Sequence, residues 1–255
     1  MPKFSNAIVR RPCQSLINGL TSVSLGKPDY KKALEQHSKY IEALRNTGLN
    51  VIVLDEDDRH PDSTFIEDVA ICTPTFAVIT RPGAESRRGE TDGIRQVLAE
   101  YYGTIEEIKH PGTLEAGDVM MTGNHFYIGI SSRTNLNGAD QLIKILQKYG
   151  MTGSTIRLDK LLHLKSGASY LENNNMLVCG ELAFCKDLEG FNHIIVDPDE
   201  SYAANSLWIN ETVLLPSGFP ETRNKIENAG YRTITLNVSE FRKVDGGLSC
   251  LSLRF

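Results

Sequence analysis

A chain of 255 residues with 40% apolar and 23% charged side chains is ordinary for a globular protein and long enough to bury a substantial core. Its formal net charge of -5 argues against nucleic acid as a partner, because nucleic-acid binding needs a basic face. The N-terminal MPKFSNAIVRRP holds no apolar run suited to a secretory signal or membrane span, and the five cysteines form no CxxC pair. We therefore expect reduced thiols in a cytoplasm, with no membrane partner.

The same order of elements recurs along the chain, although residue identities do not. A strand at 4–11 (FSNAIVRR) precedes a helix at 29–47, which is bounded by Pro28 and Gly48, and a strand at 51–55. Two apolar segments around a Thr-Pro turn, 68–72 and 76–80, then predict a hairpin.

The order of helix, strand and hairpin then returns. Helices are expected at 90–101, 135–149, about 182–188 and 221–229, and strands follow them at 104–110, 155–159, 193–197 and 233–237. Hairpins turn at Gly123-Asn124, at 173–175 and at Asn210-Glu211. A last strand, with Leu251, Leu253 and Phe255 on one face, ends the chain and places Cys250 at its mouth.

The first and last strands each lack a hairpin partner, so their pairing would complete a fifth hairpin and close a ring. The repeat spacing of roughly 40–50 residues suits ring and propeller architectures. An open α/β sheet with hairpin insertions is the alternative. The ring is favoured because it leaves no sheet edge exposed.

Equivalent loops of such a ring meet near its axis, and here they carry groups suited to chemistry. These loops hold Asp62, Glu67, Asp68, Glu115, Asp118, His163, Asn205 and Cys250. A cysteine with a histidine elsewhere in the chain is typical of thiol catalysis. Each residue also has a plain interpretation: a packed thiol, a core histidine on an apolar strand, a solvated Glu67-Asp68 pair, or a turn cap at Glu115.

Several carboxylates beside one thiol favour a planar cation as substrate, because a guanidinium pairs with carboxylates through its N–H donors. Its charge would also favour the thiolate next to it. Arg87, Arg88 and Arg133 follow hairpins and suit a substrate carboxylate, or else are surface arginines at helix starts. The loop between Gly19 and Gly26 is either a lid or a passive surface loop.

The stretches NGLTS, PDSTFIED, ITRPGAESRRGE, GTLEAGD, HFYIG with SRTN, LHLKSG and KVDGG-SC-SLRF together resemble one family over essentially the whole chain. They are similar to the dimethylarginine dimethylaminohydrolases, bacterial members of the guanidino-modifying pentein superfamily. The resemblance implies a single catalytic domain over residues 1–255. It also implies an α/β five-bladed αββαβ propeller with pseudo-fivefold symmetry, closed by pairing of the N- and C-terminal strands. The implied activity is metal- and cofactor-independent hydrolysis of Nω-methylated arginines to citrulline and methylamine or dimethylamine.

The resemblance also implies roles for residues. Cys250 would attack the guanidinium carbon and form a thiouronium intermediate, His163 would act as acid and then base, and Glu115 would orient His163. The implied substrate-binding residues are Leu20, Asp62, Phe65, Glu67, Asp68, Arg87, Arg133, Val244 and Asp245. A homodimer is a further expectation. An arginine deiminase, an amidinotransferase and a non-catalytic propeller that binds a macromolecule are the competing interpretations.

Overall fold

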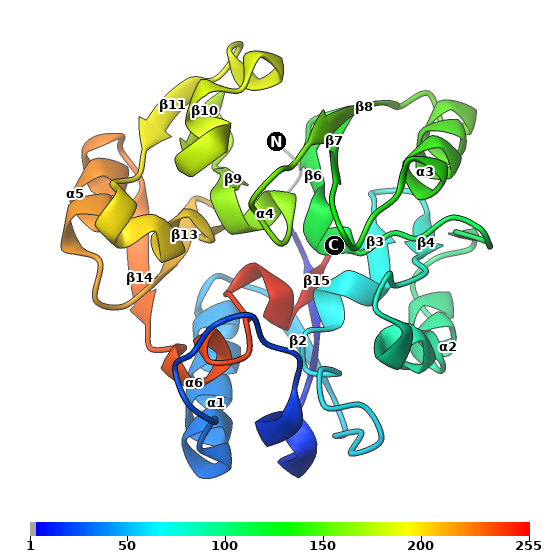
Figure 1. Ribbon diagram of the computed structural model, residues 1–255, viewed down its shortest axis with the longest axis horizontal. Helices are drawn as coiled ribbons and strands as arrows, with labels where there is room; N and C mark the ends of the chain where they lie inside the picture. Colours follow the sequence, from blue (N-terminus) through cyan, green and yellow to red (C-terminus); the bar gives the residue numbers. More distant parts are fainter. Residues whose placement is uncertain (1–3) are drawn as a thin grey trace.

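The computed structural model describes residues 4–255 and arranges five small sheets around the centre of the molecule, with the longer helices at its periphery (Figure 1). Each sheet has three strands, of which two pair antiparallel and the third pairs parallel with the middle one. In strand order the sheets are β15-β1-β2, β3-β4-β5, β6-β7-β8, β11-β10-β9 and β12-β13-β14. The predicted unit of a hairpin plus one strand is therefore confirmed.

The strands are short, as the alternating apolar segments predicted. Their bounds are β1 (Asn6–Arg10), β2 (Asn50–Leu54), β3 (Ala70–Cys72), β4 (Ala77–Ile79), β5 (Ile105–Glu107), β6 (Val119–Thr122), β7 (His125–Ile130), β8 (Thr152–Arg157), β9 (Ala168–Tyr170), β10 (Asn175–Val178), β11 (Asn192–Ile195), β12 (Leu207–Ile209), β13 (Thr212–Pro216), β14 (Arg232–Leu236) and β15 (Leu253–Arg254).

Three of the described helices begin and end within one residue of the predicted bounds. The helices are α1 (Tyr30–Asn46), α2 (Ile94–Ala99), α3 (Leu136–Lys148), α4 (Leu164–Gly167), α5 (Pro220–Asn228) and α6 (Ser239–Arg242). The Asp29 carboxylate caps α1 by accepting from the Lys32 amide at 3.1 Å, and the Asn135 amide oxygen caps α3 in the same way. Gly48, with φ of +89°, lets the chain leave α1 in the left-handed conformation.

The two ends of the described chain lie in one sheet. Strand β1 pairs antiparallel with β15, with Ala7 opposite Arg254, and parallel with β2. The predicted pairing of the N- and C-terminal strands is confirmed. The five sheets nevertheless remain separate sheets between residues 4 and 255, and no closed sheet runs round the molecule.

Three predicted elements differ from the structure. The helix expected at 90–101 is a 3-10 helix, Glu85–Thr91, followed by α2, because Gly93 between them has φ of +81°. The segment near 182–188 forms two 3-10 helices. The C-terminal strand is shorter than predicted, since Ser249–Leu251 is a 3-10 helix and Cys250 lies inside it. His163 is not on a strand but immediately precedes α4.

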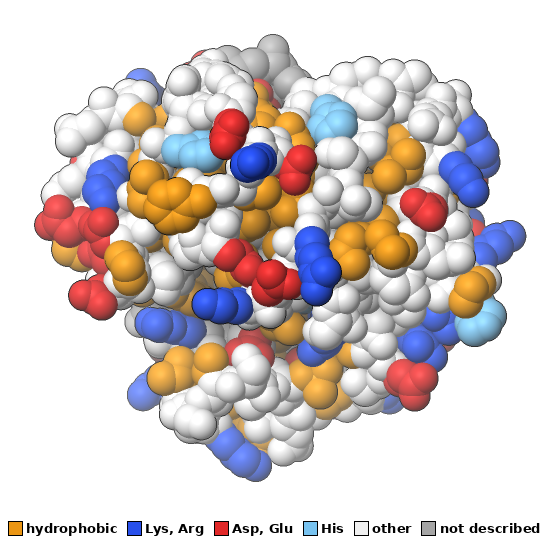
Figure 2. Space-filling view, turned by 45° about the horizontal axis from the view of Figure 1, so that its top comes forward, with side chains coloured by type: hydrophobic (Ala, Val, Ile, Leu, Met, Phe, Trp, Pro, Cys, Tyr) orange, Lys and Arg blue, Asp and Glu red, His pale blue; other side chains and the backbone are white. Residues whose placement is uncertain are grey.

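The apolar core is divided into clusters between the helices and the sheets. In one of them Tyr40 and Leu44 of α1 pack with Val9 of β1 and with Phe241. The Tyr40 hydroxyl donates to the Leu248 carbonyl at 3.0 Å, so this cluster also fixes the segment that leads to Cys250. Among the described helices, none has the length and apolar character required to cross a bilayer. Basic and acidic side chains are interspersed on the face drawn in Figure 2.

Candidate active site

The candidate site residues lie on the segments that precede the first strand of each hairpin, as the repeat predicted. Glu67 and Asp68 precede β3, Glu115 precedes β6 and His163 precedes β9. Asn205 precedes β12, and Cys250 precedes β15. These segments converge because β15 lies beside β3, and β9 lies beside both β6 and β12.

His163 and Glu115 form a buried ion pair. The imidazole Nε2 lies 2.8 Å from Glu115 Oε2, and the Glu115 side chain is fully buried. Burial alone would lower the His163 pKa, but the charges of Asp68, Glu115 and Asp118 outweigh it and raise the pKa to about 9. Burial likewise opposes ionisation of Glu115, yet the His163 hydrogen bond and nearby cations lower its pKa to about 2. At neutral pH the pair is therefore carboxylate and imidazolium.

Cys250 lies on a short turn that Asn205 holds in place. The Ser249 amide donates to Asn205 Oδ1 at 3.0 Å, and Asn205 Nδ2 donates to Ser249 Oγ at 2.9 Å. Burial, followed by the negative charges of Glu67 and Asp68, raises the pKa of the Cys250 thiol to about 12. The Cys250 side chain is therefore a neutral thiol at neutral pH, and it needs a nearby positive charge to become a thiolate.

Two adjoining cavities, both lined by His163 and Cys250, give access to these groups. The larger has a volume of about 290 Å³ and the smaller about 30 Å³. The smaller one is lined by Leu20, Asp62, Phe65, Asp68, Arg87, Arg133, Leu162, His163, Val244, Asp245, Gly246 and Cys250. It therefore brings together every residue predicted to bind substrate except Glu67.

Sequence reasoning gave no role to Leu162, Gly246 or Gly117, which also lie at these cavities. Leu162 and Gly246 are direct neighbours of His163 and Asp245 within motifs that the sequence did single out. Their position next to these motif residues was the sequence signal that could have identified them.

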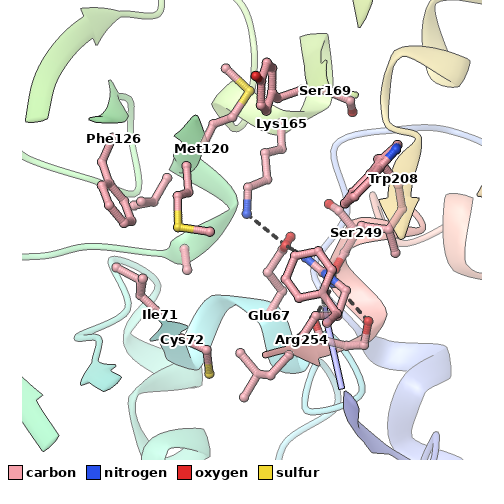
Figure 3. A pocket seen from close by; sticks show the side chains of 18 of the residues that line it. Glu67, Ile71, Cys72, Met120, Phe126, Lys165, Ser169, Trp208, Ser249 and Arg254 are labelled. Carbon is pink, nitrogen blue, oxygen red and sulfur yellow. Dashed lines mark hydrogen bonds and ion pairs between the residues drawn. The ribbon is translucent and has the colours of Figure 1, made fainter. Parts of the chain in front are cut away.

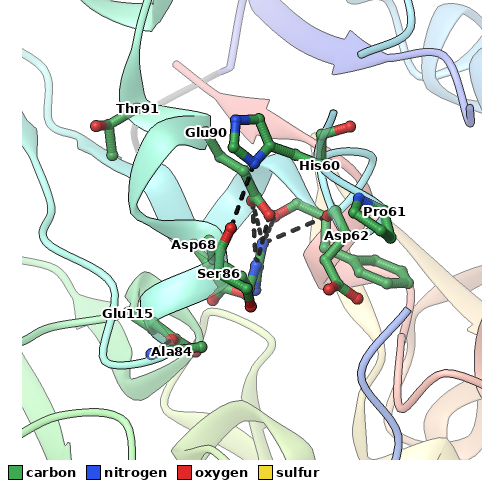
Figure 4. A network of polar contacts seen from close by, with 12 residues as sticks. His60, Pro61, Asp62, Asp68, Ala84, Ser86, Glu90, Thr91 and Glu115 are labelled. Atoms are coloured by element: carbon green, nitrogen blue, oxygen red, sulfur yellow. Dashed lines mark hydrogen bonds and ion pairs between the residues drawn. The ribbon is translucent and has the colours of Figure 1, made fainter. Parts of the chain in front are cut away.

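Arg87 is bonded to the protein's own acceptors, among them Asp68 and Glu90, which are labelled in Figure 4. Its Nη1 donates to Asp68 Oδ2 at 2.6 Å, its Nη2 donates to Glu90 Oε2 at 2.8 Å, and Nη2 also donates to the Phe65 carbonyl. Burial raises the pKa of Glu90 to about 7, against the opposing effect of Arg87. Sequence reasoning had assigned Glu90 no role and had placed Arg87 on a substrate carboxylate. In the structure Arg87 pairs with both Asp68 and Glu90.

Arg133 is held less tightly by the protein's own carboxylates than Arg87 is. Its Nη1 lies 3.4 Å from Glu115 Oε1, a longer distance than in the ion pairs of Arg87, and its side chain is 19% exposed. It lines the smaller cavity. Arg133 is thus the more available of the two for an anionic group of a ligand.

The loop from Gly19 to Gly26 borders the smaller cavity through Leu20. The Leu20 amide donates to Asp62 Oδ1 at 3.0 Å, and Thr21 Oγ1 donates to the Lys243 carbonyl at 2.9 Å. The Ser22 amide also donates to Asp245, a residue with φ of +57°. The loop is therefore attached to the segment that leads to Cys250.

Glu67 points away from this cavity. Its carboxylate bonds to Lys165 and Arg254 and lines a third cavity of about 150 Å³. The smaller catalytic cavity does not include it among its lining residues.

Asp68, Glu115 and His163 place one potential metal-ligand atom each within 4.8 Å of one another. The Asp68 oxygens already accept from Arg87 and the Gly117 amide, and His163 Nε2 is bonded to Glu115. We interpret this cluster as an ion-paired network and assign it no metal or cofactor.

Gly117 allows this network to pack closely, so we expect Gly117→Ala to impair turnover. A Cβ at this position would lie 2.9 Å from Asp68 Oδ1 and 3.0 Å from the His163 ring. Displacing the imidazole by up to about one ångström should lower kcat by about 10- to 100-fold. Gly103→Ala is the matched control, because a Cβ there meets nothing within 4 Å. Equal kcat in both folded variants would contradict the expectation.

Comparison with known proteins gives consistent results. A family model described as N,N dimethylarginine dimethylhydrolase, eukaryotic, matches residues 26–201. The N(G),N(G)-dimethylarginine dimethylaminohydrolase of Pseudomonas aeruginosa is 54% identical, covering 99% of this chain and 100% of the relative. The protein of the same name from Streptomyces coelicolor is 35% identical, covering 97% of this chain and 96% of the relative.

Solved structures that resemble this chain come from the same family. A cysteine-to-serine variant of the Pseudomonas aeruginosa protein complexed with citrulline is 54% identical, covers 100% of both chains and has a TM-score of 0.99. A histidine-to-glycine variant of a dimethylarginine dimethylaminohydrolase, an adduct with S-methyl-L-thiocitrulline, covers 99% of this chain and 100% of its own, with a TM-score of 0.98. The N-terminal domain of ArgZ, at 20% identity and a TM-score of 0.85, shares the fold.

Proposed function

The chain belongs to the dimethylarginine dimethylaminohydrolase family, and from that premise we propose that Cys250, His163 and Glu115 carry its reaction. The protein is an enzyme that hydrolyses Nω-methylated arginines to citrulline and dimethylamine or methylamine. This residue assignment rests on one observation: Cys250 and the His163 of the His163–Glu115 pair line the same cavity. The cysteine and histidine variants of the related structures also support it.

In the first half of the reaction, a bound guanidinium pairs with the Asp68 carboxylate, and its charge favours loss of the Cys250 proton to solvent. The thiolate attacks the guanidinium carbon. The bond from that carbon to the methylated nitrogen breaks as the His163 imidazolium donates its proton to the leaving amine. A thiouronium remains on Cys250.

In the second half, His163 is neutral and accepts a proton from water. The water oxygen attacks the thiouronium carbon, and the carbon–sulfur bond breaks. The second proton of the water passes to solvent, and citrulline leaves with the thiolate restored. Glu115 orients the imidazole and stabilises its protonated form in both steps, as the third member of a triad does.

The thiol titration should change when a cationic ligand binds. Without ligand the Cys250 pKa is about 12, so thiolate forms only in strong alkali. An amidine analogue of arginine that has no leaving amine adds a positive charge beside sulfur, which lowers the pKa and brings thiolate formation to lower pH. The measurement is ultraviolet thiolate absorbance against pH, with Cys250→Ser giving the background. Superimposable curves with and without the analogue would exclude activation by the substrate.

Arg133 is proposed to hold the substrate α-carboxylate, together with any donor left free on Arg87. Arg133→Ala should chiefly raise KM, since losing a charge partner at a desolvated site costs roughly 2–5 kcal/mol. The lower end is expected, because the side chain is 19% exposed. Arg88→Ala is the matched control, as Arg88 pairs with the exposed Glu85. A fall in kcat with unchanged KM would instead place Arg133 in support of Glu115.

The remaining contacts are proposed as follows. Asp62 and the backbone of Leu20 and Val244 meet the α-amine or the guanidinium, while Phe65 and Asp245 line the pocket. Glu67 stays a proposed member of the site, although it lies behind Cys250 and acts through its charge.

A panel of arginine, mono- and dimethylarginine and agmatine, assayed for citrulline-type product and for released amine, tests the activity. We expect citrulline with methylamine or dimethylamine from the methylated substrates. Ammonia released efficiently from unmethylated arginine would point to an arginine deiminase, and a transferred amidino group to an amidinotransferase. The likeness to the ArgZ domain concerns the fold alone.

The fold of the described residues is α/β, with five three-stranded sheets. We further propose that these sheets are the blades of one closed αββαβ propeller with pseudo-fivefold symmetry, forming a single domain over residues 1–255. The β1–β15 pairing and the inner strands that surround one cavity support this. The free cysteines support a cytoplasmic location. A homodimer is supported by the exposed Phe184 and Ile195, and light scattering would measure it.

A further inference from the structure

The second-last residue of the chain, Arg254, bonds to the backbone on both sides of Cys250. Figure 3 shows Arg254 beside Ser249, the residue before Cys250. Arg254 Nη1 donates to the Ser249 carbonyl at 3.0 Å and to the Ser252 carbonyl at 2.6 Å. Those carbonyls lie on either side of Cys250. The guanidinium therefore joins the start and the end of the segment that presents the nucleophile.

The other end of this guanidinium reaches Glu67. Arg254 Nη2 donates to Glu67 Oε1 at 2.7 Å, and Lys165 Nζ donates to the same oxygen at 2.8 Å (Figure 3). Glu67 is only 2% exposed, and its Oε2 has no hydrogen-bond partner among the described residues. A buried carboxylate in this state depends on its two cations for stabilisation.

The position of Lys165 makes this a link between two parts of the active site. Lys165 lies in α4, two residues after His163, while Arg254 lies in β15, four residues after Cys250. Glu67 thus joins the histidine segment to the cysteine segment through one oxygen. It also lies close enough to Cys250 for its charge to oppose thiolate formation.

We propose that Arg254 is a positioning residue for the nucleophile: it fixes the Cys250 turn through the Ser249 and Ser252 carbonyls and, with Lys165, neutralises Glu67 beside the sulfur. This inference rests on the proposed function, since it presumes that Cys250 is the reacting thiol. The strand β15 does not need this side chain, because β15 pairs with β1 through its backbone. A role in thiol reactivity is therefore separable from a role in folding.

Arg254→Met removes the positive charge and the N–H donors of the guanidinium, while it keeps most of the length of the side chain. We expect kcat for dimethylarginine to fall by about 10- to 100-fold with KM changed by less than about threefold, because the substrate contacts remain and the nucleophile is misplaced. The rate of Cys250 alkylation by iodoacetamide, followed by mass spectrometry at one fixed pH, should fall as well. Arg254→Lys should recover part of both, since a single ammonium restores the charge but not the two-sided contact.

Glu67→Gln provides a second test, which separates the effect of charge from the effect of position. Added to Arg254→Met, it removes the uncompensated charge, so alkylation should recover towards the wild-type rate while kcat stays low because the turn is still free. Arg232→Met, on the exposed side of β14, is the matched control and should change neither rate.

Normal kcat and alkylation in folded Arg254→Met would overturn the proposal, as would a change in KM alone or an equal loss in Arg232→Met. If Arg254→Met does not fold, Arg254→Lys decides, because unchanged kcat and alkylation in that variant would equally overturn it. Failure of the proposed function is distinguishable: wild-type protein would then give no citrulline, while the alkylation rates would still report on Arg254.

Discussion

Cys250→Ser is expected to abolish citrulline formation from dimethylarginine while leaving the protein folded. A serine hydroxyl is far harder to ionise than a thiol, and His163 cannot act as its base in the resting site because it is already protonated at neutral pH. Loss of a covalent nucleophile from a set of residues that act together should reduce kcat by on the order of 10³-fold or more. The measurement is citrulline release, with thermal unfolding as the check on folding.

The chain offers a matched control for this change. Cys185 is also a partly exposed cysteine and lies between two 3-10 helices, but it lines neither of the cavities that Cys250 lines. Cys185→Ser should therefore retain full turnover. Sustained citrulline production by Cys250→Ser would remove the thiol mechanism, and equal losses in both variants would point to damage from the substitution itself.

His163→Gly should separate the two halves of the reaction. Turnover of dimethylarginine should fall by about 10²- to 10⁴-fold, because the leaving amine no longer receives a proton. S-Methyl-L-thiocitrulline differs, since its leaving thiolate needs no proton to depart. The first half should then proceed with this substrate, and the adduct on Cys250 should accumulate because no base activates water.

Mass spectrometry of the intact protein, before and after proteolysis, measures that adduct. His125→Gln is the control, because the His125 ring bonds to the hydroxyls of Thr152 and Ser154 and lies outside both catalytic cavities. Rapid turnover of the adduct would show that His163 is not the group that activates water, and a Cys250 that never becomes modified would show that the first half also needs His163.

Local signals in the sequence were enough to predict most of the secondary structure. Asp29 and Gly48 bound α1 because capping and left-handed geometry are properties of single residues. The hairpins at 123–124 and 210–211 follow in the same way from residues that tolerate turns. The recurring order of elements also predicted the β1–β15 pairing, because two strands without local partners had to find each other.

The backbone around Cys250 was not predictable in this way. Leu251, Leu253 and Phe255 alternate as a strand does, yet Ser249–Leu251 forms a 3-10 helix. Two distant residues hold it there: Asn205 bonds to Ser249 across 44 positions, and Tyr40 bonds to the Leu248 carbonyl across 208. Periodicity reports which side chains are buried, and it carries no information about such long-range hydrogen bonds.

By itself, the sequence determined the repeated unit and the family and predicted the candidate residues of the site, because these depend on residue types at fixed spacings. The tertiary structure alone decided how the charges are paired. Arg87 binds Asp68 and Glu90 before any ligand, and Glu67 turns away to Lys165 and Arg254, 98 and 187 positions along the chain. Burial makes an unpaired charge costly, so each buried ion takes the partner that the fold brings nearest, and sequence distance does not indicate which partner that is.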